Sequence, residues 1–407
     1  MKPFFIFFSL VFSTLSFSQT GIKNDSIPAK IIKMLTANYK DFEVVKNQVY
    51  AVTSTDSLIV FDYKKEKIIK VENHVISVAK NNNQEIVFLN KKNQIVNFKN
   101  RSKIQIKIVC EPYKLMLDKK NIPIVITDKG VVYNDKLYEP LNVKYNHVFY
   151  RRNSSKDLNK VFLNPDLVFL DSKNRLWLTY DKGEFGEDVL FFDLEKLKFY
   201  KDEYLMIDYD YSTNQDRKDN YFVELQKAFP DKIKVSSKDT LYKFPNQLPI
   251  LNPIRGIVEK EGEFYISQSL IHFFVSSHFT LLYDFDNEGF YKSYDLTQAL
   301  LEFLPYNNFE PDLYVNEFLG PLHLNKFDNS VYYYSDKGFF KIIESNREYG
   351  KKFIFKPWIN WSATNKNNLG ADINVNKFEF VSENELFFLT SNNGIGYFNG
   401  TVVKYFH

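Results

Sequence analysis

Alternating carboxylates are the first pattern in this chain that could do chemistry. Asp208 and Asp210, with Ser212 two residues further on and Asp219 at the twelfth position, have the spacing of a calcium-binding loop. Thr213 stands where such a loop needs glycine, and an aspartate replaces the usual bidentate glutamate. We therefore interpret this segment as a solvated acidic insertion and predict no metal site.

Histidines and catalytic motifs give no stronger signal. His272 and His278 would share a face of a continuous strand, but no third zinc ligand accompanies them in the sequence. No GxSxG, HExxH or glycine-rich phosphate loop is present. The sequence thus predicts no cofactor. It leaves enzymatic activity open, because no pair among its 50 acidic residues stands out.

Aromatic side chains in the two longest non-repetitive segments, 201–250 and 345–377, are the best candidates for ligand binding. Large aromatic groups among polar residues suit the recognition of a peptide or a sugar ring. The alternative for the tryptophans is that they pack in the core between structural elements. The candidate ligand-binding residues are Trp358, Trp361, Tyr209 and Tyr211.

Composition limits the class of protein that must position these residues. The chain has 407 residues and is 17% aromatic, with 40 Phe and 27 Tyr, which favours β-strands. Its 53 basic and 50 acidic residues leave a formal charge of +3, which argues against a nucleic-acid partner. The single cysteine, Cys110, excludes an internal disulfide framework.

The first residues have the features of a secretory signal peptide. Lys2 precedes an apolar stretch over 3–17, whose 15 residues are fewer than the ~20 that a membrane-spanning helix needs. Ser16 and Ser18 are the small residues that a signal peptidase reads. We predict cleavage after Ser18 and export to the periplasm or the medium. No transmembrane segment is expected in the mature chain, because no later stretch is long, apolar and uncharged.

A repeated string of residues organises most of the remaining chain. Each copy follows an apolar run and reads as strand, tight turn and strand. Gly130, Gly338 and Gly394 stand where the turn would require a positive φ. The four copies that align best are 53–62, 127–135, 335–342 and 391–400.

Extended in both directions, this pattern gives seven units of four short strands. The second strands of the first three units start at 48, 85 and 122, a spacing near the period of propeller blades. We predict an all-β fold, a β-propeller of about seven four-stranded antiparallel blades; a sandwich pair or an open β-solenoid is the alternative. The units lie near 42–72, 75–108, 113–141, 161–200, 254–295, 322–344 and 378–406.

Two units resemble the two-component-regulator propeller repeat. Residues 169–179 read Phe-Leu-Asp-Ser-Lys-Asn-Arg-Leu-Trp-Leu-Thr, and residues 390–400 end in Gly-Tyr-Phe-Asn-Gly, as that repeat does. Asn174 replaces its usual glycine. The resemblance implies an exported, sensor-like propeller. No kinase output is expected, since nothing after the propeller resembles a kinase or a DNA-binding module.

The expected organisation has four parts. A signal peptide (1–18) and an N-terminal lead-in (19–41) precede the β-propeller (42–407), which has insertions at 201–250 and 345–377. We expect a short helix at 28–35 and further short helices at 220–229 and 296–304. Since the first unit supplies its own first strand and the last its own fourth, we expect the ring to close without strand exchange.

These observations favour an exported, non-catalytic binding or scaffold protein. It would recognise a protein, peptide or glycan through loops on one face of the propeller, where loops from several blades converge. The alternatives are a propeller-fold glycan hydrolase or lyase, which would need two carboxylates converging in the central funnel, and a purely structural surface protein. The sequence does not specify the oligomeric state.

Overall fold

The structure is a computed structural model, and what it describes is the propeller with the lead-in strand before it. The described residues are 29–36, 38–141, 143, 149–152, 160–183, 187–201, 242–245, 252–271, 275–283, 290–295, 318–347, 350–360 and 374–407. No helix in this part of the chain is long and apolar enough to cross a membrane. The predicted signal peptide and the predicted helices at 220–229 and 296–304 lie outside the described residues.

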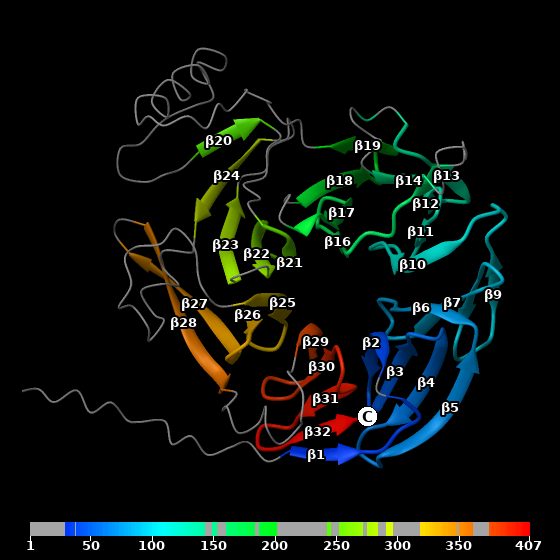
Figure 1. Cartoon of the computed structure of the whole chain (residues 1–407), viewed down its shortest axis with the longest axis horizontal. Coiled ribbons are helices and arrows are strands. Elements are labelled where there is room, and N and C mark those ends of the chain that lie inside the picture. Colours follow the sequence, from blue (N-terminus) through cyan, green and yellow to red (C-terminus); the bar gives the residue numbers. More distant parts are fainter. Residues whose placement is uncertain are drawn as a thin grey trace, which may run out of the picture.

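Seven antiparallel sheets form a ring, which confirms the predicted seven-bladed β-propeller (Figure 1). Blade 1 contains β2 (Tyr39–Val45), β3 (Gln48–Thr53), β4 (Ser57–Asp62) and β5 (Lys67–Asn73). Blade 2 contains β6 (Val75–Lys80), β7 (Ile86–Asn90), β8 (Gln94–Asn97) and β9 (Lys103–Gln105). Blade 3 contains β10 (Pro112–Leu117), β11 (Pro123–Thr127), β12 (Gly130–Tyr133) and β13 (Lys136–Tyr138). A hairpin of β14 (Tyr150–Arg152) and β15 (Lys160–Phe162) follows.

The remaining four blades complete the ring. Blade 4 contains β16 (Leu167–Leu170), β17 (Arg175–Asp181), β18 (Glu187–Asp193) and β19 (Lys198–Lys201). Blade 5 contains β21 (Ile254–Lys260), β22 (Glu263–Ile271), β23 (Val275–Tyr283) and β24 (Phe290–Asp295). Blade 6 contains β25 (Leu319–Asn325), β26 (Ser330–Ser335), β27 (Gly338–Arg347) and β28 (Gly350–Asn360). Blade 7 contains β29 (Val375–Phe380), β30 (Leu386–Thr390), β31 (Ile395–Phe398) and β32 (Val403–Phe406).

Burial along the strands follows from the radial arrangement. The middle strands are packed on both faces by neighbouring blades, so β12 and β30 are buried at every residue and read as continuous apolar runs. The outer strand β5 instead alternates half-buried and exposed residues. The middle strands are thus buried, whereas an outer strand such as β5 leaves one side to water.

The turn between the second and third strands is the repeated element seen in the sequence. Gly130, Gly338 and Gly394 have φ values of 142°, 128° and 73°, as predicted. In the copy without glycine, Asp56 takes the same place with φ 61°. The hydroxyl of Thr390 closes the last of these turns by donating to the Gly394 carbonyl at 2.7 Å. The same backbone geometry therefore recurs where the residue types differ.

Replacing Gly394 by alanine should destabilise the protein by about 2 kcal/mol, measured by chemical denaturation. An added Cβ would lie 2.1 Å from the Phe406 carbonyl oxygen, in addition to the strain of the positive φ. Gly262→Ala is the matched control, because φ there is 82° and no atom lies within 4 Å of the added Cβ. That variant should lose about 1 kcal/mol from φ strain alone. Equal losses in the two variants would contradict the close approach of β32.

The ring closes through a strand from the N-terminal lead-in, contrary to two expectations. Residues Ala29–Ile32 form strand β1, not a helix, and β1 pairs in parallel with β32 as a fifth strand of blade 7. His407 N–H donates to the Ile32 carbonyl at 2.9 Å. The fourth strand of blade 7 would otherwise present unpaired backbone groups, and β1 satisfies them. The two ends of the chain therefore share one blade.

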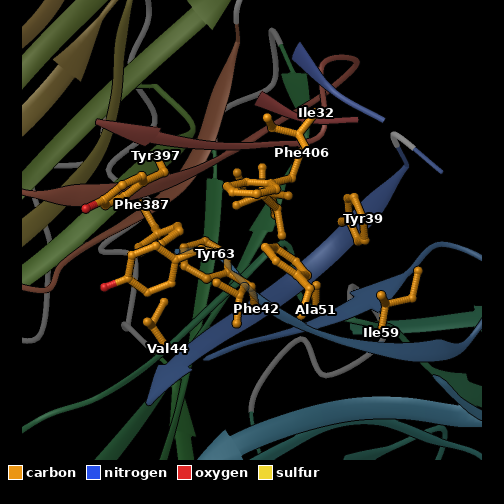
Figure 2. Close-up of a cluster of buried hydrophobic side chains, with 14 residues drawn as sticks. Ile32, Tyr39, Phe42, Val44, Ala51, Ile59, Tyr63, Phe387, Tyr397 and Phe406 are labelled. Carbon is orange, nitrogen blue, oxygen red and sulfur yellow. The ribbon is translucent and has the colours of Figure 1, made fainter. Parts of the chain in front are cut away.

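Aromatic side chains fill the joint between blades 7 and 1 (Figure 2). The Phe387 and Tyr397 rings of blade 7 are stacked at 4.6 Å, and Tyr63 of blade 1 packs edge-on against Phe387 at 4.8 Å. Ile32 of β1 belongs to the same cluster, as does Phe406 of β32. The lead-in strand thus contributes to the closing core as well as to the sheet.

Two segments expected as insertions contain strands. Residues 350–360, inside the expected insertion 345–377, form β28, the fourth strand of blade 6. β28 pairs with β27 over the whole length from Gly338–Asn360 to Arg347–Gly350. Within the expected insertion 201–250, β20 (Tyr242–Pro245) pairs with β24 as a fifth strand of blade 5. Parts of both expected insertions therefore belong to blades: β28 completes blade 6, and β20 adds an edge strand to blade 5.

Candidate functional site

The structure describes one of the four predicted ligand-binding residues. Trp358 lies in β28, where it is half-buried and packs against three rings: Tyr332 at 5.5 Å, Phe380 at 5.2 Å and Phe398 at 5.5 Å. These rings belong to blades 6 and 7, so Trp358 lies in the joint between the two blades. Trp361, Tyr209 and Tyr211 lie outside the described residues, and whether the four side chains meet stays a prediction.

The end of the ring where the first strand of each blade starts is here called the entry face. The first strands lie nearest the ring axis (Figure 1). The turns between second and third strands form hydrogen bonds with the chain at the starts of the first strands. Val75 N–H donates to Asp56 O, and Ser391 N–H donates to Asn374 O, both at 2.9 Å. First-strand starts and these turns thus form one surface around the axis.

Charged side chains from non-adjacent blades meet on the axis. The Lys80 ammonium of blade 2 donates to the Glu379 carboxylate of blade 7 and lies 3.4 Å from Glu43 Oε2 of blade 1. It also donates to the Val44 carbonyl at 3.2 Å. Because blade 1 stands between blades 2 and 7, the contact between Lys80 and Glu379 must run along the axial side of blade 1. These three charged residues form the inner layer of what we call the axial cluster.

A second layer lies closer to the entry face. The Lys377 ammonium of blade 7 donates to Asp41 Oδ1 at 2.9 Å, to the Phe42 carbonyl at 2.6 Å and to Glu43 Oε1 at 3.3 Å. Lys114 of blade 3 is close enough to Asp41 and Lys377 for their charges to act on it. Asp41, Lys114 and Lys377 form this outer layer, and the axial cluster comprises both layers.

A bulge near the start of three first strands precedes each residue of the outer layer. In blades 1, 3 and 7 the pairing shifts by one residue between Tyr39 and Asp41, between Pro112 and Lys114, and between Val375 and Lys377. Asp41, Lys114 and Lys377 are each the first paired residue after the shift, so they take equivalent positions. The equivalent residue in blade 2 is Ser77, whose hydroxyl accepts from Leu115 N–H at 3.1 Å.

Burial and neighbouring charges shift the pKa values of the groups in the axial cluster. Burial alone would raise the pKa of Asp41, but the ammonium groups of Lys377 and Lys114 outweigh it and hold that pKa below its usual value. Burial together with the neighbouring Glu43 carboxylate raises the pKa of Glu379. Burial and the Lys377 charge lower the pKa of Lys114. The three carboxylates and three ammonium groups therefore act as one coupled set.

Sequence reasoning missed the axial cluster, although a signal exists. Asp41-Phe42-Glu43 and Lys377-Phe378-Glu379 share a charge–Phe–charge pattern in the first strands of blades 1 and 7. In both, the phenylalanine is buried between blades and the two charged residues belong to the axial cluster. Charges at alternate positions on either side of a buried phenylalanine in a first strand could have indicated side chains directed to the axis.

A second titratable group lies where blades 4 and 5 meet. The Glu187 carboxylate, at the start of β18, accepts from Ile254 N–H at the start of β21 at 3.0 Å. Glu187 is only 4% exposed. Burial, together with the carboxylates of Asp181 and Asp166, raises the pKa of Glu187 to about 7. Asp181 in turn pairs with Arg255 of blade 5 at 2.9 Å. These polar contacts join the two blades at the entry face.

Glu187→Gln should stabilise the protein at pH 8 by on the order of 2 kcal/mol. Glutamine keeps an oxygen for Ile254 N–H and removes a buried charge. The folded-state pKa of Glu187, about 7, lies above its ordinary value of 4.5, so ionisation opposes folding. The difference from the wild type should therefore be full above pH 7 and disappear as pH falls from 7 to 4.5. Melts of both proteins across this range measure it, and a constant difference would contradict the assignment.

Comparisons with known proteins return solved structures of low sequence identity. No protein-family model and no curated protein matches the chain. Solved propellers match over most of it, among them the extracellular domain of the putative one component system BT4673 from B. thetaiotaomicron, with 8% identity and a TM-score of 0.42 over 92% of this chain. This chain spans 40% of that one. The structures that match thus include an extracellular domain of the kind that the repeat in the sequence resembles.

Two further structures illustrate how general the likeness is. YCF48 bound to D1 peptide matches with 11% identity and a TM-score of 0.46, covering 94% of this chain and 98% of that one. The WD40 repeats of RRP9 match with 10% identity and a TM-score of 0.43, covering 90% and 92%. At such identities the matches assign no function to this chain.

Proposed function

We propose that this chain is an exported, non-catalytic binding protein whose protein or peptide partner docks on the entry face. The observation that carries this proposal is the axial cluster. Its ion-paired side chains retain 17% to 35% exposure, although partly buried ion pairs contribute little net stability. Charged groups gathered from four blades at a partly accessible point suit the recognition of a partner better than they suit packing.

The connections between blades support the same face. β19 ends at Lys201 and β21 begins at Ile254, and β28 ends at Asn360 before β29 begins at Val375. Fourth strands end, and first strands begin, at the entry face. The segments that carry Tyr209, Tyr211 and Trp361 therefore start and end there, and we propose these three residues as partner contacts.

The alternative of a glycan hydrolase or lyase is less well supported. The axial cluster does bring together two carboxylates, those of Glu43 and Glu379. However, the Lys80 ammonium contacts both, so it occupies the place between them that a scissile bond would need. A lysine held in this position favours binding over acid–base cleavage.

A peptide and glycan array with the purified chain tests the proposed function. To locate the binding face, a polyethylene glycol maleimide is attached to a single cysteine in a Cys110→Ser background. Lys129→Cys places it on an exposed entry-face turn, and Asn83→Cys places it on an exposed turn at the opposite end of the ring. We expect a ligand whose binding is lost only with the label at 129. Absence of any ligand, or loss only with the label at 83, would refute the proposal.

Export is tested separately by sequencing the N-terminus of protein recovered outside the cytoplasm. Cleavage after Ser18 should leave Gln19 as the first residue. Retention of Met1 in a membrane fraction would show that the apolar stretch acts as an uncleaved anchor.

A further inference from the structure

Lys114 differs from the other lysines of the axial cluster. Lys80 and Lys377 each contact carboxylates from another blade. Within the described residues, the Lys114 ammonium has no hydrogen bond and no ion pair, although it occupies the same position after the bulge as Asp41 and Lys377. Its side chain is therefore directed to the axis at the outer layer, the first layer met from the entry face.

The surroundings of Lys114 leave its ammonium group without an ion pair in contact. The Asp41 and Glu43 carboxylates act on its charge from a distance, but both are hydrogen-bonded to Lys377. Blade 2, between Asp41 and Lys114, offers only the small Ser77 at this level, and its hydroxyl is buried against Leu115 N–H. An ammonium group that has lost hydration and has no counter-ion in contact is costly, and an incoming anion would reduce that cost.

The chemistry of the site favours a carboxylate over a neutral sugar ring. The Lys80–Glu379 contact crosses from blade 2 to blade 7 along the axial side of blade 1, beneath the outer layer. A carboxylate pairs with an ammonium group, whereas a neutral sugar ring would leave that charge unpaired. Among the side chains whose burial the structure describes, Phe327 is the only largely exposed aromatic one, and it lies in the turn after β25, at the opposite end from the entry face.

We propose that the outer layer of the axial cluster is a carboxylate-binding site, in which the Lys114 ammonium receives an acidic side chain of a peptide partner. This inference rests on the proposed function, because it names the chemistry of the partner at the entry face. Asp41 and Lys377 position the site by pairing with each other, so that Lys114 is the one ammonium group of the axial cluster without an ion pair among the described residues. Specificity would come from the repulsion of a second carboxylate by Asp41 and Glu43.

The test compares a glutamate peptide, acetyl-Gln-Glu-Gln-Gln-amide, with a glutamine peptide, acetyl-(Gln)4-amide, by calorimetric titration of the full chain. The glutamate peptide should bind at least tenfold more tightly than the glutamine peptide. Lys114→Met should weaken the binding of the glutamate peptide by about 10–100-fold and leave the affinity for the glutamine peptide unchanged. Lys103→Met, on the exposed outer strand β9, is the matched control and should change neither affinity.

A second readout keeps the test valid if calorimetric signals are small. After reductive methylation with ¹³C, the NMR signal of Lys114 should shift on addition of the glutamate peptide and not of the glutamine peptide. Equal binding of the two peptides, an unaffected Lys114→Met variant, or no binding of either peptide would overturn the carboxylate site. Because array binding and labelling at 129 do not involve these peptides, the proposed function would fail or survive independently.

Discussion

Replacing Lys377 by methionine should lower the free energy of unfolding by about 3 kcal/mol, the largest single effect we expect from a charged residue of this chain. Its ammonium group donates to Asp41 of blade 1 at 2.9 Å and to the Phe42 carbonyl at 2.6 Å, so it ties blade 7 to blade 1 at the axis. Methionine would fill similar space and leave Asp41 and Glu43 without their main counter-charge. The 35% exposure of the Lys377 side chain keeps the loss below that of a fully buried pair.

Two further variants separate charge from packing in this prediction. Lys377→Met combined with Asp41→Asn removes both partners of the pair and should recover part of the loss in a double-mutant cycle. Lys91→Met is the matched control, because Lys91 pairs with Asp56 at 2.8 Å with its own side chain 52% exposed, and a surface salt bridge contributes at most about 1 kcal/mol. A loss in Lys377→Met no larger than in the control would show that the axial charges are solvated like surface ones.

The blades could be predicted from sequence because their signals are local. A hairpin turn needs a positive φ at one position, and glycine at 130, 338 and 394 marks it within a few residues of the strands it joins. Asp56 shows that the backbone, and not the glycine itself, is what repeats. Seven such units can bury their sheet faces only against one another, so the ring follows from the count.

Two missed strands have different causes. β1 is four residues long, and its pairing partner, β32, lies at the other end of the chain. Nothing near Ile32 indicates that pairing, so the local pattern was interpreted as a helix; here non-local pairing overrides local preference. β28 was missed because β27 and β28, of 10 and 11 residues, are much longer than the short strands on which the repeat was aligned.

The axial cluster could be predicted only in part for a related reason. A charge–Phe–charge pattern identifies alternate faces of one strand, and Asp41-Phe42-Glu43 carries it clearly. Which blade supplies the opposite charge depends on how the ring closes. The contact of Lys80 with Glu379 joins blades 2 and 7, which are not neighbours in the ring, and residues that are far apart in sequence. No rule of local spacing predicts such a contact.

Trp358→Ala should lower the free energy of unfolding by about 3 kcal/mol, because a large ring is removed from the joint between blades 6 and 7. Trp358 contacts Tyr332 on its own blade and both Phe380 and Phe398 on the next, at 5.2 to 5.5 Å between ring centres. The cavity would open between two blades that must stay in contact for the ring to remain closed. Chemical denaturation of the variant measures the loss.

The same substitution decides between the two interpretations of Trp358 that the sequence left open. If Trp358 is a packing residue, Trp358→Phe should retain most of the stability, and the affinity for an array ligand should change in neither variant. Phe327→Ala, at a side chain 58% exposed, is the control and should cost less than about 0.5 kcal/mol. If instead Trp358 is a partner contact, alanine would leave unfolding unchanged and weaken binding by the ~2–4 kcal/mol typical of an aromatic anchor. The three ring contacts favour the first result, since they engage the indole from both blades.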